Sequence, residues 1–251
     1  DRQVILNAIK HKNNNLSDNL KLNLVKEATK IKKLPTSITL KTARINSKEV
    51  TKNDIFFAIR GKKNDGNKYV AESFKRKASL AVVNKIQNKL NKSRQIKVKN
   101  TLKFLTDISK TFRKSIDTNI IAITGSCGKT TLKELLGNVL SKISKVSISP
   151  KSYNNKFGVP LSLFNLKQND EFGILEVGMD KKGEIDYLSK IIEPDVGVIT
   201  NINYAHAKNF KNIKQIALAK SEIINNIKPC LLYTSPSPRD QRGARVPGCG
   251  W

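Results

Sequence analysis

The chain has 251 residues and a formal net charge of +27, because 47 Lys and Arg residues outnumber 20 Asp and Glu residues. This length is sufficient for two modest domains with a buried core. The sequence contains no run of about eighteen apolar residues and no leader with basic, apolar and small-residue parts, so nothing in it predicts membrane insertion or export. Its three Cys residues lack the spacing of a metal site, and we therefore expect a cytoplasmic protein without disulfides.

The excess of basic residues does not by itself indicate a nucleic-acid partner. Nine of the 47 basic residues are Arg and the other 38 are Lys, and the lysines are scattered along the chain among many Asn and Ile residues. That scatter is typical of the codon bias of an AT-rich genome. A nucleic-acid-binding protein more often clusters its basic residues and interleaves aromatic ones, which make up only 6% of this chain. We expect no nucleic-acid partner.

The first part of the chain predicts a small α/β domain. Short apolar segments alternate with Gly turns over 45–50, 53–61 and 64–70. The spacing of Leu102, Leu105, Ile108 and Phe112 predicts a helix, and a polar stretch at 117–119 follows it. We place a domain boundary there, which gives an N-terminal domain over 1–116 and a second domain from residue 117.

The most informative stretch is a strand pattern at 120–124 that leads into Gly125-Ser126-Cys127-Gly128-Lys129-Thr130-Thr131. The two glycines let backbone N–H groups turn towards an oxyanion, and Lys129 adds a positive charge for terminal phosphates. Thr130 offers a hydroxyl for Mg²⁺. An apolar helical period from Leu132 to Leu140 follows, so strand, loop and helix occur in the order of a phosphate-binding loop. A plain glycine-rich turn is the alternative, but it has no use for the Lys-Thr pair.

Two later segments place polar residues at predicted element ends. Asn154 and Asn155 precede a Gly-Val-Pro helix start, where Asn also occurs simply as a turn residue. The segment 172–179 reads as a buried parallel strand that contains Glu176. After a phosphate-binding loop, such a carboxylate lies beside the phosphates and can hold Mg²⁺.

A third predicted strand at 195–202 leads to His206, and Lys220 lies on the next predicted helix, fourteen residues further on (220 minus 206). A single His just past a strand is as often structural as functional. Lys220 taken alone is one of many surface lysines.

Together these segments resemble the Mur ligase family of ATP-dependent amide-forming enzymes. The phosphate loop is shortened, because Ile123 stands where the common loop has Gly, and this short loop is similar to that of Mur ligases. The strand that ends in Thr-Asn, the Ala-His and the Ala-Lys on the next helix also look like the family pattern. The Asn-Asn-x-x-Gly-Val-Pro segment at 154–160 resembles the family members that add D-alanyl-D-alanine, whereas those that add the third amino acid usually have Thr-Thr-Pro there.

The resemblance implies a uridine-nucleotide-binding α/β domain over 1–116 and the first half of a parallel-sheet ATPase domain over 117–229. It implies that residues 125–131, together with Asn154 and Asn155, hold ATP. It also implies that Thr130 and Glu176 hold one Mg²⁺ and that His206 binds a second. In the family the Lys that corresponds to Lys220 is carbamylated and becomes an anionic oxygen ligand. The expected catalytic set is therefore Lys129, Glu176, His206 and Lys220.

At residues 46–48 the family pattern is Asp-Ser-Arg, and this chain has Asn46-Ser47-Lys48. Losing the guanidinium removes a bidentate partner for phosphate or carboxylate. We therefore retain only Ser47 as a predicted contact of the uridine nucleotide.

The implied reaction passes the γ-phosphate of ATP to the terminal carboxylate of UDP-N-acetylmuramoyl-tripeptide. The amine of D-alanyl-D-alanine then attacks the acyl phosphate. We expect a monomer that uses ATP and Mg²⁺ and works in peptidoglycan synthesis. The alternatives are a tripeptide-forming Mur ligase, folylpolyglutamate synthase and a basic P-loop protein that binds nucleic acid. The pattern at 45–70 argues against the folate enzyme, and the nucleic-acid reading leaves the Asn pair, His206 and Lys220 unexplained.

The composition changes abruptly near Pro229. Six Arg residues occur in the 229 residues up to that point, whereas the last 22 residues contain three Arg and no Lys. Residues 230–240 also match the translation of a transposase-type sequencing adapter. We expect 230–251 to be a non-native tail on a truncated chain that is inactive alone.

Overall fold

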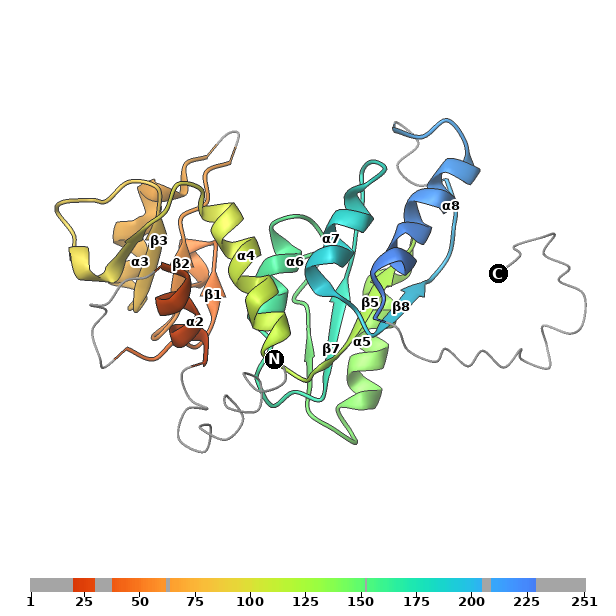
Figure 1. The fold of residues 1–251 in the computed structure, drawn as a ribbon, viewed down its shortest axis with the longest axis horizontal. Helices are drawn as coiled ribbons and strands as arrows, with labels where there is room; N and C mark the ends of the chain where they lie inside the picture. Colours follow the sequence, from red (N-terminus) through yellow and green to blue (C-terminus); the bar gives the residue numbers. More distant parts are fainter. Residues whose placement is uncertain (1–19, 30–37, 62–63, 152, 205–208, 229–251) are drawn as a thin grey trace, which may run out of the picture.

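The computed structural model describes residues 20–29, 38–61, 64–151, 153–204 and 209–228. Within these residues the chain forms two four-stranded parallel sheets that follow one another along the sequence (Figure 1). The α/β class and the parallel strands predicted from the sequence are confirmed. His206 and the tail at 230–251 lie outside the described residues, so the predictions made for them stay predictions. None of the described helices is long and apolar enough to cross a membrane.

The first sheet contains β1 (Ala43–Arg44), β2 (Ile55–Phe57), β3 (Leu80–Val83) and β4 (Gln95–Lys97), in this spatial order. The helices around it are α2 (Leu20–Thr29) and α3 (Val70–Lys75), with short 3-10 turns η2 (Ser47–Glu49), η3 (Gly66–Tyr69) and η4 (Lys92–Arg94). Phe57 belongs to the apolar cluster that includes Leu22 of α2, whereas Phe56 packs with Val70 of α3. Both faces are therefore buried, which is why these strands read as apolar runs.

The second sheet contains β5 (Asn119–Thr124), β6 (Val146–Ile148), β7 (Phe172–Glu176) and β8 (Val196–Ile199), in the order β6-β7-β5-β8. Its helices are α5 (Lys129–Leu140), α6 (Gly158–Phe164), α7 (Glu184–Ile192) and α8 (Ile213–Ser221), and the short η6 (Glu222–Asn226) follows. Three of the four strands were predicted; β6 was not. Because β5 pairs with both β7 and β8, the carboxyl ends of these three strands meet at one edge.

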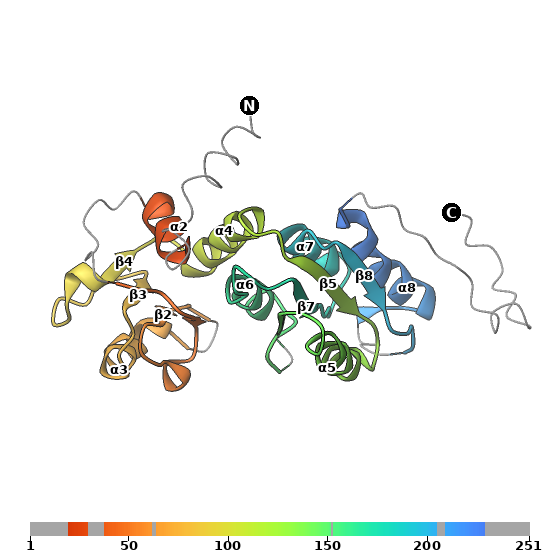
Figure 2. The same cartoon turned by 90° about the horizontal axis from the view of Figure 1, so that it is seen from below.

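Helix α4 (Thr101–Lys114) joins the two sheets and lies between them (Figure 2). At its start, Thr101 Oγ1 donates to the carbonyl of Ala58, 3.1 Å away, in the N-terminal part. Near its end, the Phe112 ring meets the Phe164 ring of α6 edge to face, with centroids 5.5 Å apart. A single apolar cluster therefore runs from the first sheet through α4 into the second. The predicted boundary near residue 116 falls between α4 and β5.

The end of α4 is anchored by a buried Arg113, whose side chain is 1% exposed. Its guanidinium donates to the carbonyl of Ile192 at 2.8 Å, to that of Thr118 at 3.0 Å and to Asp195 Oδ2 at 2.7 Å. Asp195 Oδ2 also accepts the N–H of Ile120, 2.7 Å away. This network ties α4 to the starts of β5 and β8, at the amino ends of the strands.

At the opposite ends of the strands, the loop after β5 packs tightly against the residue after β8. Gly125 has a φ of +147°, and a Cβ built there lies 1.9 Å from Thr200 Oγ1. That hydroxyl donates to the carbonyl of Cys127 at 2.6 Å. The position therefore requires Gly, both for its backbone conformation and for its close contact with Thr200.

Replacing Arg113 with Met is expected to lower the free energy of unfolding by about 3 kcal/mol, because it removes the guanidinium donor to the carbonyls of Ile192 and Thr118 and the buried ion-pair partner of Asp195. The matched control is Lys103→Met on the exposed side of α4, which should leave stability nearly unchanged. Urea unfolding measures both values. Equal stability of the two variants would contradict the anchoring role.

Gly125→Ala is expected to lower the free energy of unfolding by about 2 kcal/mol or more, from positive φ and from the collision with Thr200. Adding Thr200→Ala should recover part of the loss, since it removes the nearest colliding atom. Gly61→Ala is the control, because the nearest atom to its added Cβ is 3.5 Å away. Thermal unfolding compares the variants, and a Gly125→Ala protein as stable as the parent would refute the packing argument.

Candidate active site

The predicted phosphate loop lies where strand β5 passes into helix α5. Gly128 adopts a left-handed φ of +79° and starts α5, and no side chain in the described part of the chain caps this helix. The first intrahelical bond is donated by the N–H of Leu132 to the carbonyl of Gly128. The earlier N–H groups of the first turn therefore have no acceptor within the helix, and such a helix start can bind an anion.

Hydrogen bonds within the chain hold the first part of the loop, at Ser126 and Cys127, in place. The N–H of Ser126 donates to the carbonyl of Asn201 at 3.0 Å, and the N–H of Cys127 donates to Asn201 Oδ1 at 3.0 Å. These two amides are thus engaged within the chain, and the N–H groups that remain for an anion belong to the start of α5. The role of Asn201 was missed, although the Thr-Asn strand ending had been noted as a family feature.

Three of the predicted site residues meet at the end of β7. Glu176 is buried, with 2% of its surface exposed. One of its oxygens accepts the hydroxyl of Thr130 at 2.8 Å, and the other accepts Asn154 Nδ2 at 2.7 Å. The register that places Glu176 opposite Ile123 of β5 brings the carboxylate beside the phosphate loop.

Asn155 plays a different part from Asn154. Its Oδ1 accepts the N–H groups of Phe157 and Gly158 at 3.0 and 3.1 Å, which is the turn interpretation of this residue. Asn155 also borders the cavity described below. Its binding role stays a prediction.

Lys129 and Lys220 lie in the same cavity, from α5 and α8. Lys129 Nζ donates to the carbonyl of Gly125 at 2.9 Å. Lys220 is 1% exposed, and burial together with the positive charge of Lys129 lowers its pKa to about 8. Taken alone, the sequence suggested that Lys220 is a surface lysine, whereas in the structure it is buried.

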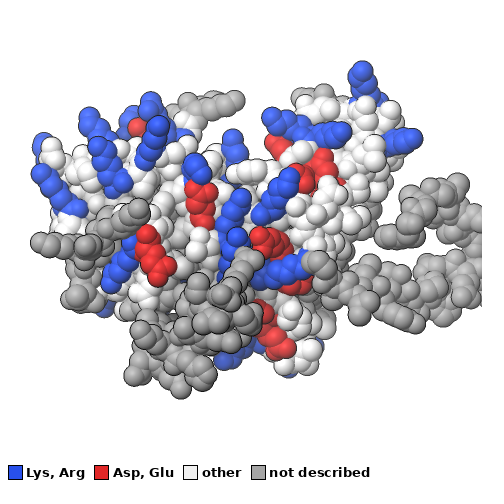
Figure 3. Space-filling model, in the orientation of Figure 1, with Lys and Arg blue, Asp and Glu red and all other residues white. Residues whose placement is uncertain are grey.

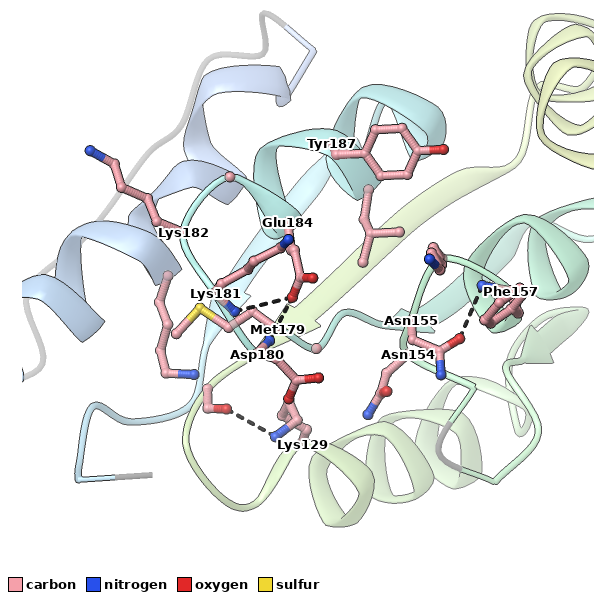
Figure 4. A pocket seen from close by; sticks show the side chains of 16 residues that line it. Lys129, Asn154, Asn155, Phe157, Met179, Asp180, Lys181, Lys182, Glu184 and Tyr187 are labelled. Atoms are coloured by element: carbon pink, nitrogen blue, oxygen red, sulfur yellow. Dashed lines mark hydrogen bonds between the residues drawn. The ribbon is translucent and has the colours of Figure 1, made fainter. Parts of the chain in front are cut away.

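The cavity has a volume of about 670 Å³ and opens above the phosphate loop (Figure 4). Five predicted residues line it, namely Gly125, Lys129, Asn154, Asn155 and Lys220. The rest of the lining was not indicated by the sequence and consists of Lys156, Phe157, Gly178, Met179, Asp180, Lys181, Lys182, Gly183, Glu184, Tyr187 and Leu188. Most of the unpredicted group comes from the connection between β7 and α7. There Glu184 Oε2 accepts the N–H groups of Asp180 and Lys181, at 2.6 and 3.2 Å.

Ser47 is remote from this set. It begins turn η2, is 5% exposed, and donates its hydroxyl to Glu72 Oε2 at 2.7 Å. It does not line the cavity above the phosphate loop. Its contact with a uridine nucleotide stays a prediction.

Residues 123–238 match the model of the Mur ligase middle domain. The chain is 37% identical over 185 residues to the UDP-N-acetylmuramoyl-tripeptide–D-alanyl-D-alanine ligase of Buchnera aphidicola subsp. Acyrthosiphon pisum, covering 74% of this chain and 40% of the relative. It is 34% identical over 198 residues to the ligase of the same name from Bacillus subtilis, covering 77% and 43%. The chain thus spans about two fifths of the length of these curated relatives.

The structure is similar to MurF from Acinetobacter baumannii, with a TM-score of 0.72 and 32% identity over 82% of this chain and 46% of that one. It is also similar to MurF from Thermotoga maritima in complex with ADP, with a TM-score of 0.64 and 32% identity over 75% of this chain and 44% of that one. These likenesses extend over both sheets and agree with the short phosphate loop and its buried Glu176. The chain belongs to the Mur ligase family.

Proposed function

We propose that this chain serves ATP-dependent amide bond formation, in which D-alanyl-D-alanine is added to UDP-N-acetylmuramoyl-tripeptide during peptidoglycan precursor synthesis. The observation that carries the proposal is the meeting of Thr130, Asn154 and Glu176 beside the Lys129 loop. The names of the Buchnera and Bacillus relatives support the substrates, and the ADP complex of the Thermotoga relative supports the nucleotide.

The donor set at Glu176 fits Mg²⁺. The Glu176 carboxylate and the Thr130 hydroxyl are hard oxygen donors, and Mg²⁺ is typically held by one or two carboxylates together with phosphate oxygens. Glu176 and Thr130 would hold the ion, and His206 is proposed for a second one. A bound Mg²⁺ would offset the negative charge of the phosphates.

The chain's own residues would bind and orient the nucleotide. The start of α5 directs its N–H groups and positive dipole end towards an anion. Lys129 would leave the carbonyl of Gly125 for the terminal phosphates, adding a full charge to the site. In the proposed reaction, a carboxylate oxygen takes the γ-phosphoryl group and ADP leaves; the amine then attacks the carbonyl carbon and phosphate leaves. Catalysis of this kind depends mainly on positioning and charge.

The competing readings are weaker. The segment at 154–160 and the names of the relatives favour the D-alanyl-D-alanine-adding ligase over a tripeptide-forming ligase or folylpolyglutamate synthase. Basic side chains spread over both halves of the visible face, with acidic ones among them, rather than forming one stripe (Figure 3). This spread supports the proposal that nucleic acid is not the partner. We further propose a cytoplasmic monomer and a non-native tail at 230–251.

Because this chain is expected to be inactive alone, the direct test is ADP release by a full-length ligase that contains it, in the presence of ATP, Mg²⁺ and UDP-N-acetylmuramoyl-tripeptide. Release that requires D-alanyl-D-alanine supports the proposal, whereas release that requires a single amino acid instead supports a sibling ligase. ATP affinity is measured separately by calorimetry, so that nucleotide binding can be judged even where turnover is absent. A chain without affinity for ATP would refute the assignment of the loop.

Lys129→Ala is expected to lower the affinity for MgATP by about tenfold or more, because it removes a charged donor to phosphate. In a full-length ligase that contains this chain, turnover should fall by on the order of 10³-fold, as for the loss of a group that stabilises a transferring phosphoryl group. The control is Lys142→Ala, an exposed lysine just past the end of α5. Calorimetry and ADP release measure the two effects, and near-normal values for Lys129→Ala would overturn the role.

In the active full-length enzyme, Lys220 is expected to carry a carbamate. Carbamates form only on a neutral amine, and the lowering of the Lys220 pKa from 10.5 to about 8 increases the neutral fraction near neutral pH. In ¹³C-bicarbonate, NMR should show a carbamate signal that disappears in Lys220→Ala and persists in Lys182→Ala, which alters another cavity lysine. A spectrum without the signal, or the same signal in Lys220→Ala, would contradict the prediction.

A further inference from the structure

Lys133 has no part in the function proposed so far, yet it is fully buried, with 0% of its surface exposed. It lies four residues after Lys129 on α5, which places the two lysines on neighbouring turns of one helix side. A buried ammonium is unfavourable unless its donors are satisfied. Lys133 Nζ donates to the carbonyls of Ser149 and Lys151, each 2.7 Å away, and lies 3.3 Å from Glu134 Oε1.

The two carbonyls that accept hydrogen bonds from Lys133 belong to Ser149 and Lys151, which lie between β6 and Asn154. Ser149 connects this segment to β7, because its N–H donates to the carbonyl of Ile174 at 2.9 Å and its Oγ accepts the N–H of Glu176 at 3.2 Å. Asn154 connects it again, since its carbonyl accepts the N–H of Gly178 at 2.7 Å. Lys133 thus contacts the backbone that holds both hydrogen-bonding partners in the Asn154–Glu176 pair.

The backbone at Lys151 is in the left-handed region, with a φ of +47°. Residues other than Gly adopt this conformation rarely, and it persists only where surrounding contacts determine it. The bond from the buried ammonium to the Lys151 carbonyl is such a contact. Lys151 precedes Asn154 by three positions in the chain.

We propose that Lys133 is a positioning residue for the phosphate and metal site: its buried ammonium holds the 149–151 turn against α5 so that Asn154 and Thr130 both reach Glu176. The metal-binding part of this inference rests on the proposed function. The positioning part concerns the chain itself and does not require a ligand.

The first experiment measures hydrogen exchange in the chain without any ligand. Lys133→Met keeps the length of the side chain and removes its donors. The amides of Glu176 and Gly178, which donate to Ser149 Oγ and to the Asn154 carbonyl, should exchange on the order of tenfold faster, while amides of β3 stay unchanged. Glu134→Gln is the control, because it weakens only the ion pair and leaves both carbonyl bonds. Unchanged exchange at Glu176 and Gly178 in Lys133→Met would overturn the proposal.

The second experiment measures binding of a non-hydrolysable ATP analogue, with Mg²⁺ and with EDTA, by calorimetry. Lys133→Met should lose about tenfold to a hundredfold of the affinity in Mg²⁺, as is usual for partners of metal ligands, and keep its affinity in EDTA within about twofold. Equal losses in both conditions would show that Lys133 only supports the fold, and would overturn the proposal.

Two further outcomes remain decisive. A parent chain that binds no nucleotide refutes the proposed function, while hydrogen exchange still decides whether Lys133 positions Asn154. If Lys133→Met does not fold, Lys133→Gln, which has a shorter, uncharged side chain with an NH₂ donor group, replaces it. If the amides of Glu176 and Gly178 exchange faster in that variant than in the parent, but more slowly than fully exposed amides, the proposal is supported. An exchange rate equal to that of the parent contradicts it.

Discussion

The buried carboxylate of Glu176 is the constraint around which the second sheet is organised. A carboxylate with 2% exposure is strongly unfavourable without hydrogen-bond donors. Its donors come from two separate elements, the hydroxyl of Thr130 at the start of α5 and the amide of Asn154 before α6. The end of β7, the phosphate loop and the segment after β6 must therefore hold fixed positions relative to one another.

Because the strands are parallel, the candidate site and the Arg113–Asp195 network lie at opposite ends of the second sheet. The carboxyl ends of β5, β7 and β8 carry the phosphate loop, Glu176 and the Thr200-Asn201 brace. The amino ends of β5 and β8 carry the network of Arg113 and Asp195. In open parallel sheets ligands bind outside the carboxyl ends, so the rigid contacts at the other end stabilise the sheet without occupying the site.

Apolar packing across α4 joins the two sheets. The Phe164 ring of α6 meets both the Phe57 ring of β2 and the Phe112 ring of α4 across the junction. A polar contact accompanies them: the Asn165 side chain accepts the Ala43 N–H at 2.6 Å and donates to the Ala43 carbonyl at 3.0 Å. The orientation of the first sheet towards the phosphate loop is thus set by side-chain packing and a paired hydrogen bond.

The sequence by itself determined the local features. The phosphate loop, the apolar helical periodicity of α4 and the apolar runs of β5, β7 and β8 depend on residues close together in the chain. Their spacing can be read directly from the sequence. A carboxylate at the end of a strand next to such a loop also identified Glu176. The short β6 was not recognised, because three residues at a sheet edge carry little periodic signal.

Only the tertiary structure decided the rest. Lys133 and Lys220 look like any of the 38 lysines, and their burial depends on segments far along the chain that fold over them. Asn154 and Asn155 are neighbours of the same type, yet Asn154 bonds to Glu176 and Asn155 accepts the N–H groups of Phe157 and Gly158. The physical reason is that burial, pKa and hydrogen-bond partners are set by contacts between distant residues, which spacing in a single sequence does not contain.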